Sequence, residues 1–292
     1  MSNVYHGQDL DKQTRIFVPW WKVKKLTRGE YRWGAVLAFA GLHLAVLGAI
    51  WIPWSWSYLA LLLFTYALRM FGVTAGYHRY FSHRSYRLRR IPQFLIAVLA
   101  QTSAQKGALW WAAHHRVHHR ESDRERDVHS PWQQGFWWSH VGWVLSNQHD
   151  EFDERSMADF AKFPELVWLN KHHWVPTVVF AAAVLAATGW TGFFWGYVVS
   201  TVLLYHGTFS INSIGHIWGG RRFDTPDFSK NNAVLAVLTM GEGWHNNHHF
   251  SPGSCRQGLR WWEVDATWYL LKALSWVGLA ADLRPFRKVD TR

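Results

Sequence analysis

The chain has 292 residues, of which 49% are hydrophobic and 17% are charged, with 22 tryptophans and a formal net charge of +11. This composition excludes a disordered or collagen-like chain, and the single cysteine, Cys255, excludes a disulfide framework and a cysteine-ligated metal site. Such a high tryptophan content is typical of a protein at a membrane–water interface. The excess of basic residues alone does not distinguish nucleic acid from anionic lipid as a partner.

The first apolar region follows a polar segment, residues 1–33, that carries seven Lys and Arg and lacks the pattern of a cleaved signal peptide. Residues 34–54 and 57–77 are each close to the ~20 residues that cross ~30 Å of hydrocarbon. We therefore predict a transmembrane hairpin over residues 34–77.

A second apolar region has the same organisation. Residues 174–188 and 192–211 are apolar and are joined by a short connection at 189–191, which predicts a second hairpin over 174–211. The apolar stretch at 91–100 is too short to cross a bilayer, so we expect it in the interface or packed beneath a domain.

The distribution of basic residues predicts the orientation. Both hairpin tips lack Lys and Arg, and only Arg69 of the 31 basic residues lies inside a predicted span. By the positive-inside rule the remaining segments face the cytoplasm. We therefore predict an all-α integral membrane protein with four transmembrane helices and cytoplasmic termini, and we expect no nucleic-acid partner. The predicted cytosolic parts are residues 1–33, 78–173 and 212–292, of which the last two form one cap.

Nine of the eighteen histidines occur in patterned groups. In two boxes the spacing is i, i+3 and i+4, which places three imidazoles along one helix face. A third group is a pair spaced i and i+5, which suits a place where a helix ends or bends, and the ninth histidine, His216, follows the last predicted span. Neutral imidazole binds first-row metals, and nine ligands exceed one ion's capacity, so we predict two metals with four or five ligands each. The nine are His78, His83, His115, His118, His119, His216, His245, His248 and His249.

The other nine histidines are expected to be ordinary polar residues: His6, His43, His114, His129, His140, His149, His172, His173 and His206. Carboxylates that accept hydrogen bonds from metal-bound imidazoles fix their tautomers. The acidic candidates for this task are Asp123, Glu242 and Glu263.

Five stretches carry a resemblance: GVTAGYHRYFSHRSYR, HHRVHH, GFWWSHVGW, NSIGH and GEGWHNNHHF. They resemble the membrane fatty acyl desaturases, in particular bacterial acyl-CoA (stearoyl-CoA-type) Δ9 desaturases, from about Gly34 to Pro285. The resemblance implies a four-helix stalk and a cytosolic cap with a di-iron centre. It assigns the nine histidines as ligands and Asn212 as a ligand through water. It also implies a bent acyl tunnel shaped by Gln105, Trp111 and Thr208.

The implied activity is O₂-dependent insertion of a cis double bond, expected at Δ9, into a saturated long-chain acyl group. It uses two iron ions and two external electrons, and zinc can replace iron in overexpressed protein. Family members that grip coenzyme A carry Arg-Asp before the second box and an Asn nine residues ahead of its first histidine. Here those positions hold Ala113-His114 and Lys106. Acyl-CoA is still the expected carrier, with acyl-lipid and acyl-ACP left open.

The other implied partners are membrane lipid and a separate electron donor of the ferredoxin or cytochrome b5/reductase type. The expected location is a bacterial inner membrane. One alternative is a fatty acyl or lipid hydroxylase or mono-oxygenase on the same histidine platform. A metal-binding membrane transporter or sensor is an alternative from another class. A transport path needs polar residues through the spans, and these spans offer little beyond His43, Arg69 and His206.

Overall fold

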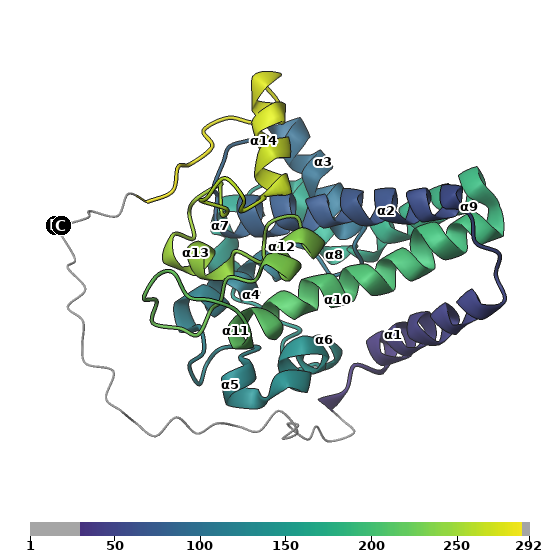
Figure 1. Ribbon diagram of the computed structural model, residues 1–292, viewed down its shortest axis with the longest axis horizontal. Helices are drawn as coiled ribbons and strands as arrows, with labels where there is room; N and C mark the ends of the chain where they lie inside the picture. The colour runs from purple at the N-terminus through teal and green to yellow at the C-terminus, as the bar shows by residue number, and fades with distance from the viewer. Residues whose placement is uncertain (1–29, 288–292) are drawn as a thin grey trace.

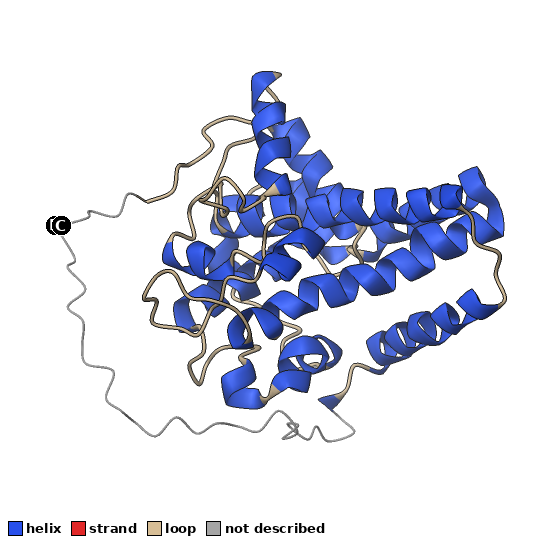
Figure 2. Ribbon diagram, viewed as in Figure 1, coloured by secondary structure: helices blue, strands red, loops and turns tan. Residues whose placement is uncertain are grey.

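The computed structural model describes residues 30–287, and throughout this range the regular structure is helical. No β-strand forms within these residues, and only isolated bridges occur, such as that between Gly220 and Asn231. Figure 2 shows helices connected by loops. The predicted all-α class is therefore confirmed for the described residues.

In chain order, and with the short 3₁₀ and π segments named by type, the helical elements are α1 (Trp33–Val46), a 3₁₀ turn (Leu47–Ile50), α2 (Trp56–Phe71), a π segment (Gly72–Ser82), α3 (Arg90–Gln101), α4 (Ala108–Glu121), α5 (Pro131–Gln134), a π segment (Trp138–Gly142), α6 (Trp143–Leu145), a 3₁₀ turn (Glu154–Met157), α7 (Ala158–Ala161), α8 (Pro164–Lys171), α9 (Trp174–Phe193), a π segment (Phe194–Val199), α10 (Ser200–Asn212), α11 (Ile214–Ile217), α12 (Ala233–Leu238), α13 (His245–Phe250) and α14 (Ala266–Trp276).

Three helical runs among the described residues are long and apolar enough to cross a membrane: Trp33–Ile50, Trp56–Ser82 and Trp174–Ile217. The first two lie over the predicted first hairpin, and the second continues to Ser82, five residues beyond the predicted end at residue 77. The third has 44 residues and covers both remaining predicted spans in one run. The 12-residue α3, which contains the stretch at 91–100, is not among them, as expected.

The 44-residue run is broken inside the predicted connection. Gly189 has φ +66° and ψ −173°, a conformation that a residue without Cβ adopts at low cost. The hydroxyls of Thr177 and Tyr197 lie 2.8 Å apart on either side of this break, so the chain folds back on itself there. Figure 1 shows the resulting arrangement, with α1, α2, α9 and α10 extended at one end and the short helices gathered at the other.

Arg69 lies inside the second run and is fully buried. Its guanidinium donates to the hydroxyls of Thr201 at 2.7 Å and Ser200 at 2.6 Å, and it lies over the rings of Phe180 and Tyr197. These hydroxyl and ring contacts compensate the loss of water around the charge. Arg69 therefore ties α2 to the chain around α10.

The π segment Gly72–Ser82 continues α2 and carries the first histidine of the first pair, His78. All its residues are buried, and it packs between α3 and α4. A Cβ at Gly72 would lie 2.8 Å from the carbonyl oxygen of Leu99, and one at Gly76 would lie 3.1 Å from Ile96. The two glycines therefore permit close contact with α3, which fixes the position of the histidines that follow.

Candidate metal centre and adjoining cavity

The structure divides the nine patterned histidines into a group of five and a group of four. Within each group, one ring nitrogen of every residue lies within 4.8 Å of those of the others. This matches the predicted four or five imidazoles for each metal. The five-histidine group contains His78, His83, His115, His119 and His248, and the four-histidine group contains His118, His216, His245 and His249.

The first pair meets because the helix widens. The backbone N–H of His83 donates to the carbonyl oxygen of His78 at 3.2 Å, which is the i to i+5 bond of a π-helix. Residues five apart then lie on one face, and the two ring centroids are 4.8 Å apart. An ideal α-helix would have directed these two rings to different sides, so the π segment explains the spacing in the sequence.

Each HxxHH box contributes to both groups. On α4, His115 and His119 join the five-histidine group, and His118 joins the other. On α13 the division is reversed, because His248 joins the five-histidine group while His245 and His249 join the four-histidine group. The two helices therefore lie between the groups and hold them side by side, with α11 supplying His216.

Four carboxylates contact Nδ1 atoms of these rings. A carboxylate that accepts from Nδ1–H leaves the lone pair of Nε2 facing the interior of the group. One ring of the five-histidine group and three rings of the four-histidine group thereby gain a fixed orientation. The contacts are Glu242 to His78 at 2.5 Å, Asp127 to His118 at 3.0 Å, Asp123 to His216 at 2.7 Å and Asp227 to His249 at 2.8 Å.

Two of the three acidic predictions are confirmed, because Asp123 and Glu242 contact imidazoles. The prediction for Glu263 is wrong. Its carboxylate accepts from the backbone N–H of Leu259 at 2.7 Å and from the side-chain amide of Asn247 at 3.3 Å, so it holds a turn beside the third box.

Sequence reasoning missed Asp127 and Asp227. Asp127 stands in an Asp-Val-His triplet shortly after the second box, and this position was a signal for it. Asp227 lies in the loop between α11 and α12, where the sequence shows no pattern. Burial alone would raise the pKa of each carboxyl group, but the nearby imidazole outweighs burial and holds that pKa well below its usual range.

A buried cation supports Glu242. Arg79 donates to Oε1 of Glu242 at 3.1 Å and to Asp265 at 2.9 Å. Burial alone would raise the pKa of Glu242, but His78 and Arg79 lower it to about 2. The carboxylate is therefore ionised at neutral pH, which lets it accept from the imidazole.

The donor set fits bound metal. Nε2 of His78 lies 3.0 Å from Nε2 of His248, and Nε2 of His83 lies 2.9 Å from that of His115. Burial, and then the neighbouring imidazoles, lower the pKa of His83, His115 and His248 well below 6.5, so these rings are neutral. Nε2 of His249 is buried without a hydrogen-bond partner among residues 30–287. Neutral imidazole nitrogens that converge in this way suit a first-row transition metal.

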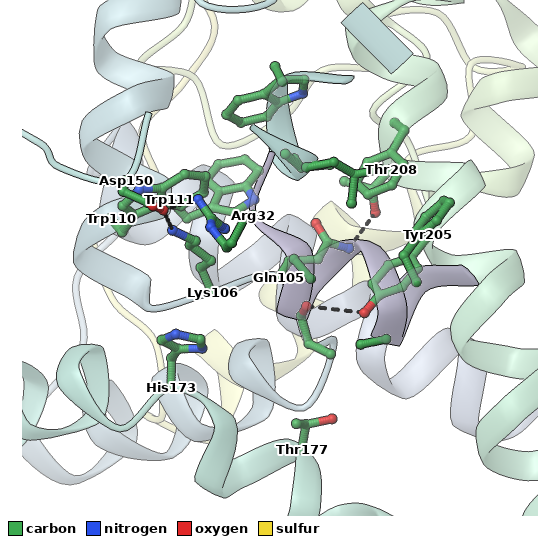
Figure 3. Close-up of a pocket in the computed structure, with 18 of the residues that line it drawn as sticks. Arg32, Gln105, Lys106, Trp110, Trp111, Asp150, His173, Thr177, Tyr205 and Thr208 are labelled. Carbon is green, nitrogen blue, oxygen red and sulfur yellow. Dashed lines mark hydrogen bonds and ion pairs between the residues drawn. The ribbon is translucent and has the colours of Figure 1, made fainter. Parts of the chain in front are cut away.

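A cavity of about 680 Å³ adjoins the histidines, within the size range of ligand sites. Figure 3 shows that Gln105, Trp111 and Thr208, the three predicted tunnel residues, all line it. The side-chain amide of Gln105 donates to the hydroxyl of Thr208 at 3.1 Å. Trp111 stacks between Tyr77, at 5.4 Å between ring centroids, and His115, at 5.0 Å.

The cavity reaches the five-histidine group at one side, through His115. A second, smaller space of about 40 Å³ borders His78 and His118 and shares Trp111, His115 and Asn212 with the large cavity. Asn212 therefore lies between the two spaces. Elsewhere the wall of the large cavity includes charged and polar residues: Arg32, Lys106, Asp150 and His173.

Comparisons with known proteins agree with this arrangement. The sequence profile of the fatty acid desaturase family matches residues 53–278. Over 257 residues the chain is 37% identical to the sn-2 palmitoyl-lipid 9-desaturase of Nostoc sp. (strain 36), covering 86% of this chain and 90% of that protein. It is 36% identical to the sn-1 stearoyl-lipid 9-desaturase of Anabaena variabilis, covering 88% and 96%. It is also 36% identical to the icosanoyl-CoA 5-desaturase of Limnanthes douglasii, covering 83% and 69%.

The family match spans every histidine of both groups as well as the cavity residues Gln105, Trp111 and Thr208. The relatives cover most of the chain at more than one-third identity. The predicted resemblance is thus confirmed, and the chain belongs to the fatty acid desaturase family.

Proposed function

We propose that the protein is an O₂-dependent fatty acyl desaturase that places a cis double bond, at Δ9, in a saturated long-chain acyl group. The observation that carries this proposal is that the 680 Å³ cavity reaches His115 of the five-histidine group and shares Trp111, His115 and Asn212 with the small space, which borders His118 and His245 of the other group. An acyl chain in the cavity would lie against the rings that bind metal. The balanced reaction converts a CH₂–CH₂ unit, O₂, two electrons and two protons into a CH=CH unit and two molecules of water.

The proposed metal is iron, with one ion in each group. The nine histidines of the two groups would be its ligands, and Asn212 would contact the ion of the four-histidine group through water. Methylene C–H bonds are too weakly acidic for a side-chain base to remove the proton. A reduced di-iron centre, when bound, would supply an O₂-dependent oxidation that does not need an acidic proton. The assignment of Asn212 is supported by its position, because it lines the small space that borders His118 and His245.

The chain's own residues orient the ligands and exclude water. Asp127, Asp227 and Glu242 hold Nδ1–H of their imidazoles, so that Nε2 presents a lone pair to each group. His118 and His248 are almost completely buried, which keeps bulk water from the site.

The cavity wall selects the methylenes that meet the metal. The hydrogen bond between Gln105 and Thr208 joins the chain before α4 to α10, and Trp111 lies beside it on α4. We propose that these three residues bend the acyl chain and fix the position of the double bond. The support is that they line one cavity and that Trp111 stacks directly on His115.

The proposed topology has four spans, with the run Trp174–Ile217 crossing twice about Gly189. The fold-back between Thr177 and Tyr197 supports two crossings, and the distribution of Lys and Arg supports a cytoplasmic site in a bacterial inner membrane. We propose the division 34–77 and 174–211 for the membrane and 78–173 and 212–292 for the cap. Electrons would come from a separate ferredoxin or cytochrome b5/reductase-type donor.

Expression in a desaturase-deficient host, followed by mass spectrometry with localisation of double bonds, tests the reaction. A new Δ9 monoene is expected. Purified protein supplied with acyl-CoA or with glycerolipid then identifies the carrier: acyl-CoA is the first proposal, whereas the Nostoc and Anabaena relatives are named for acyl-lipid. An alcohol that contains ¹⁸O from ¹⁸O₂, formed by iron-loaded protein with a working donor, would instead establish a hydroxylase.

A further inference from the structure

Three histidines outside the two groups form a continuous hydrogen-bonded chain. Nε2 of His43, on α1, lies 3.0 Å from Nε2 of His206, on α10. The other nitrogen of that ring, Nδ1 of His206, lies 3.0 Å from Nε2 of His140, in the π segment Trp138–Gly142. The three lie far apart in the sequence, His140 within the GFWWSHVGW stretch, and the fold joins them.

The contact at one end of this row of hydrogen bonds orders the protons on the three rings. Nδ1 of His43 lies 2.7 Å from the carbonyl oxygen of Phe39, which only accepts, so Nδ1 carries the proton. With one proton on each ring, Nε2 of His43 accepts from Nε2–H of His206, and Nδ1 of His206 accepts from Nε2–H of His140. Burial, and then His206, lower the pKa of His140 to about 4, so this ring is neutral at pH 7. Nδ1 of His140 is left as an acceptor.

The other end of the chain contacts the junction between α10 and α11. Nδ1 of His140 lies 2.9 Å from the hydroxyl of Ser213, which is also 3.1 Å from the carbonyl oxygen of Phe209, so its one proton is shared between these two acceptors. The adjacent residue, Ser139, donates from its hydroxyl to the carbonyl oxygen of Asn212 at 2.9 Å. Ser139 and His140 thus contact Asn212 and Ser213, respectively, at the point where α10 ends. His216 follows within one turn and is fully buried.

We propose that His140 is a positioning residue for the four-histidine group. By holding Ser213 it sets the turn that directs Asn212 toward the cavities and brings His216 to the other three rings. This inference rests on the proposed function, because it takes Asn212 and His216 as metal-binding residues. A metal site tolerates displacements of only about 0.5 Å in its ligands. A single hydrogen bond at the junction therefore affects the binding of metal by the four-histidine group.

Simple packing would be the competing role. The ring of His140 stacks on Phe136, with centroids 5.4 Å apart and planes at 10°. If the ring served only for packing, the His140→Phe protein would bind as much iron as the wild type. If His140 positions the junction, the Nδ1 contact is the one that matters and a phenyl ring cannot replace it.

Two polar substitutions separate the contacts of His140. The amide of Asn reaches the position of Nδ1 and keeps the bond with Ser213, whereas the longer Gln reaches the position of Nε2 and keeps the bond with His206. Full-length protein in detergent is loaded with Fe(II), and iron per chain is measured together with the Mössbauer spectrum. We expect His140→Asn to keep about two irons, and His140→Gln and His140→Phe to fall toward one.

Equal iron contents in the Asn and Gln variants, or wild-type behaviour of His140→Phe, would overturn the inference. A wild-type protein that binds no iron would overturn the proposed function, which is a different result. A measurement that needs no substitution is the ¹⁵N NMR spectrum of histidine-labelled wild type. It should show His43 protonated on Nδ1 and both His206 and His140 protonated on Nε2. Any other pattern of protonation contradicts the proposed order of hydrogen bonds.

Discussion

Asp227 accepts a hydrogen bond from Nδ1 of His249 at 2.8 Å, and Nε2 of the same buried ring has no hydrogen-bond partner within residues 30–287. The carboxylate thus fixes a tautomer whose free nitrogen faces the four-histidine group. The hydroxyl of Ser229 also donates to this carboxylate, at 2.5 Å, which restrains it further. A residue from an unpatterned loop therefore prepares one of the proposed ligands.

Asp227→Ala should weaken the binding of iron about 10- to 100-fold, as is usual when the carboxylate partner of a metal-bound imidazole is removed. Titration of metal-free protein with Fe(II) measures the effect. Asp224→Ala is the matched control, because Asp224 belongs to the same loop and is exposed, with a 3.5 Å ion pair to Arg221. Equal affinities of the two variants would show that Asp227 does not act through His249.

The division of the histidines predicts that substitutions in different groups remove different metals. His83→Ala should lose the iron of the five-histidine group and His118→Ala that of the four-histidine group, each lowering iron per chain toward one and abolishing desaturation. Mössbauer spectra would show which signal disappears. His172→Ala serves as the control, because this ring contacts Trp168 and belongs to neither group. A His118→Ala protein that keeps both its metal and its activity would refute the ligand assignment.

The sequence predicts the helices of the second and third boxes because their spacing repeats a helical period. It cannot predict that His118 separates from His115 and His119, since this depends on where α13 packs against α4. The same limit applies to Asp227, whose loop has no period at all. Contacts between distant segments follow from packing, which a local pattern does not encode.

Lone histidines show this limit most clearly. His43, His140 and His206 stand in distant parts of the chain, and although His140 lies in the GFWWSHVGW stretch, no sequence pattern pairs the three with one another. Their hydrogen bonds span 66 and 163 residues of sequence. At Gly189, by contrast, the local signal was sufficient, because glycine next to an apolar run favours the break that the structure contains.

The metal-free protein should lose stability as the pH falls from 7 to 5. Burial, and then neighbouring imidazoles, lower the pKa of His83, His115 and His245 in the folded state, whereas in the unfolded chain they titrate near 6.5. Below that pH the unfolded state binds more protons, which costs about 1.4 kcal/mol per pH unit for each group. The carboxylates Asp127 and Asp227, whose pKa values are lowered, keep their contribution until the pH is far lower.

Thermal unfolding of metal-free protein between pH 7.5 and 5 measures this dependence. The melting temperature should fall with pH, and bound Fe(II) should raise it most near neutrality, because metal competes with protons for the same nitrogens. A melting temperature that is constant or rises on acidification would contradict the lowered pKa values.

The hydrogen bond between Gln105 and Thr208 should control where in the acyl chain the double bond forms. Thr208→Val keeps the shape of the side chain but removes the hydroxyl that accepts from Gln105 at 3.1 Å, which leaves a buried amide unpaired in the cavity wall. We expect the wall to relax and the product to become a mixture of double-bond positions. Mass spectrometry of the monoenes gives the ratio, which should change several-fold.

Thr188→Val is the matched control, because it makes the same substitution on α9 at a residue that does not line the cavity and whose hydroxyl donates to the carbonyl oxygen of Val184. Both variants lose one hydroxyl in an apolar region, so a general effect on stability would appear in both. A change of regiochemistry confined to Thr208→Val would place the selection of the methylenes at the Gln105–Thr208 bond, whereas unchanged products in both variants would move it to another part of the cavity wall.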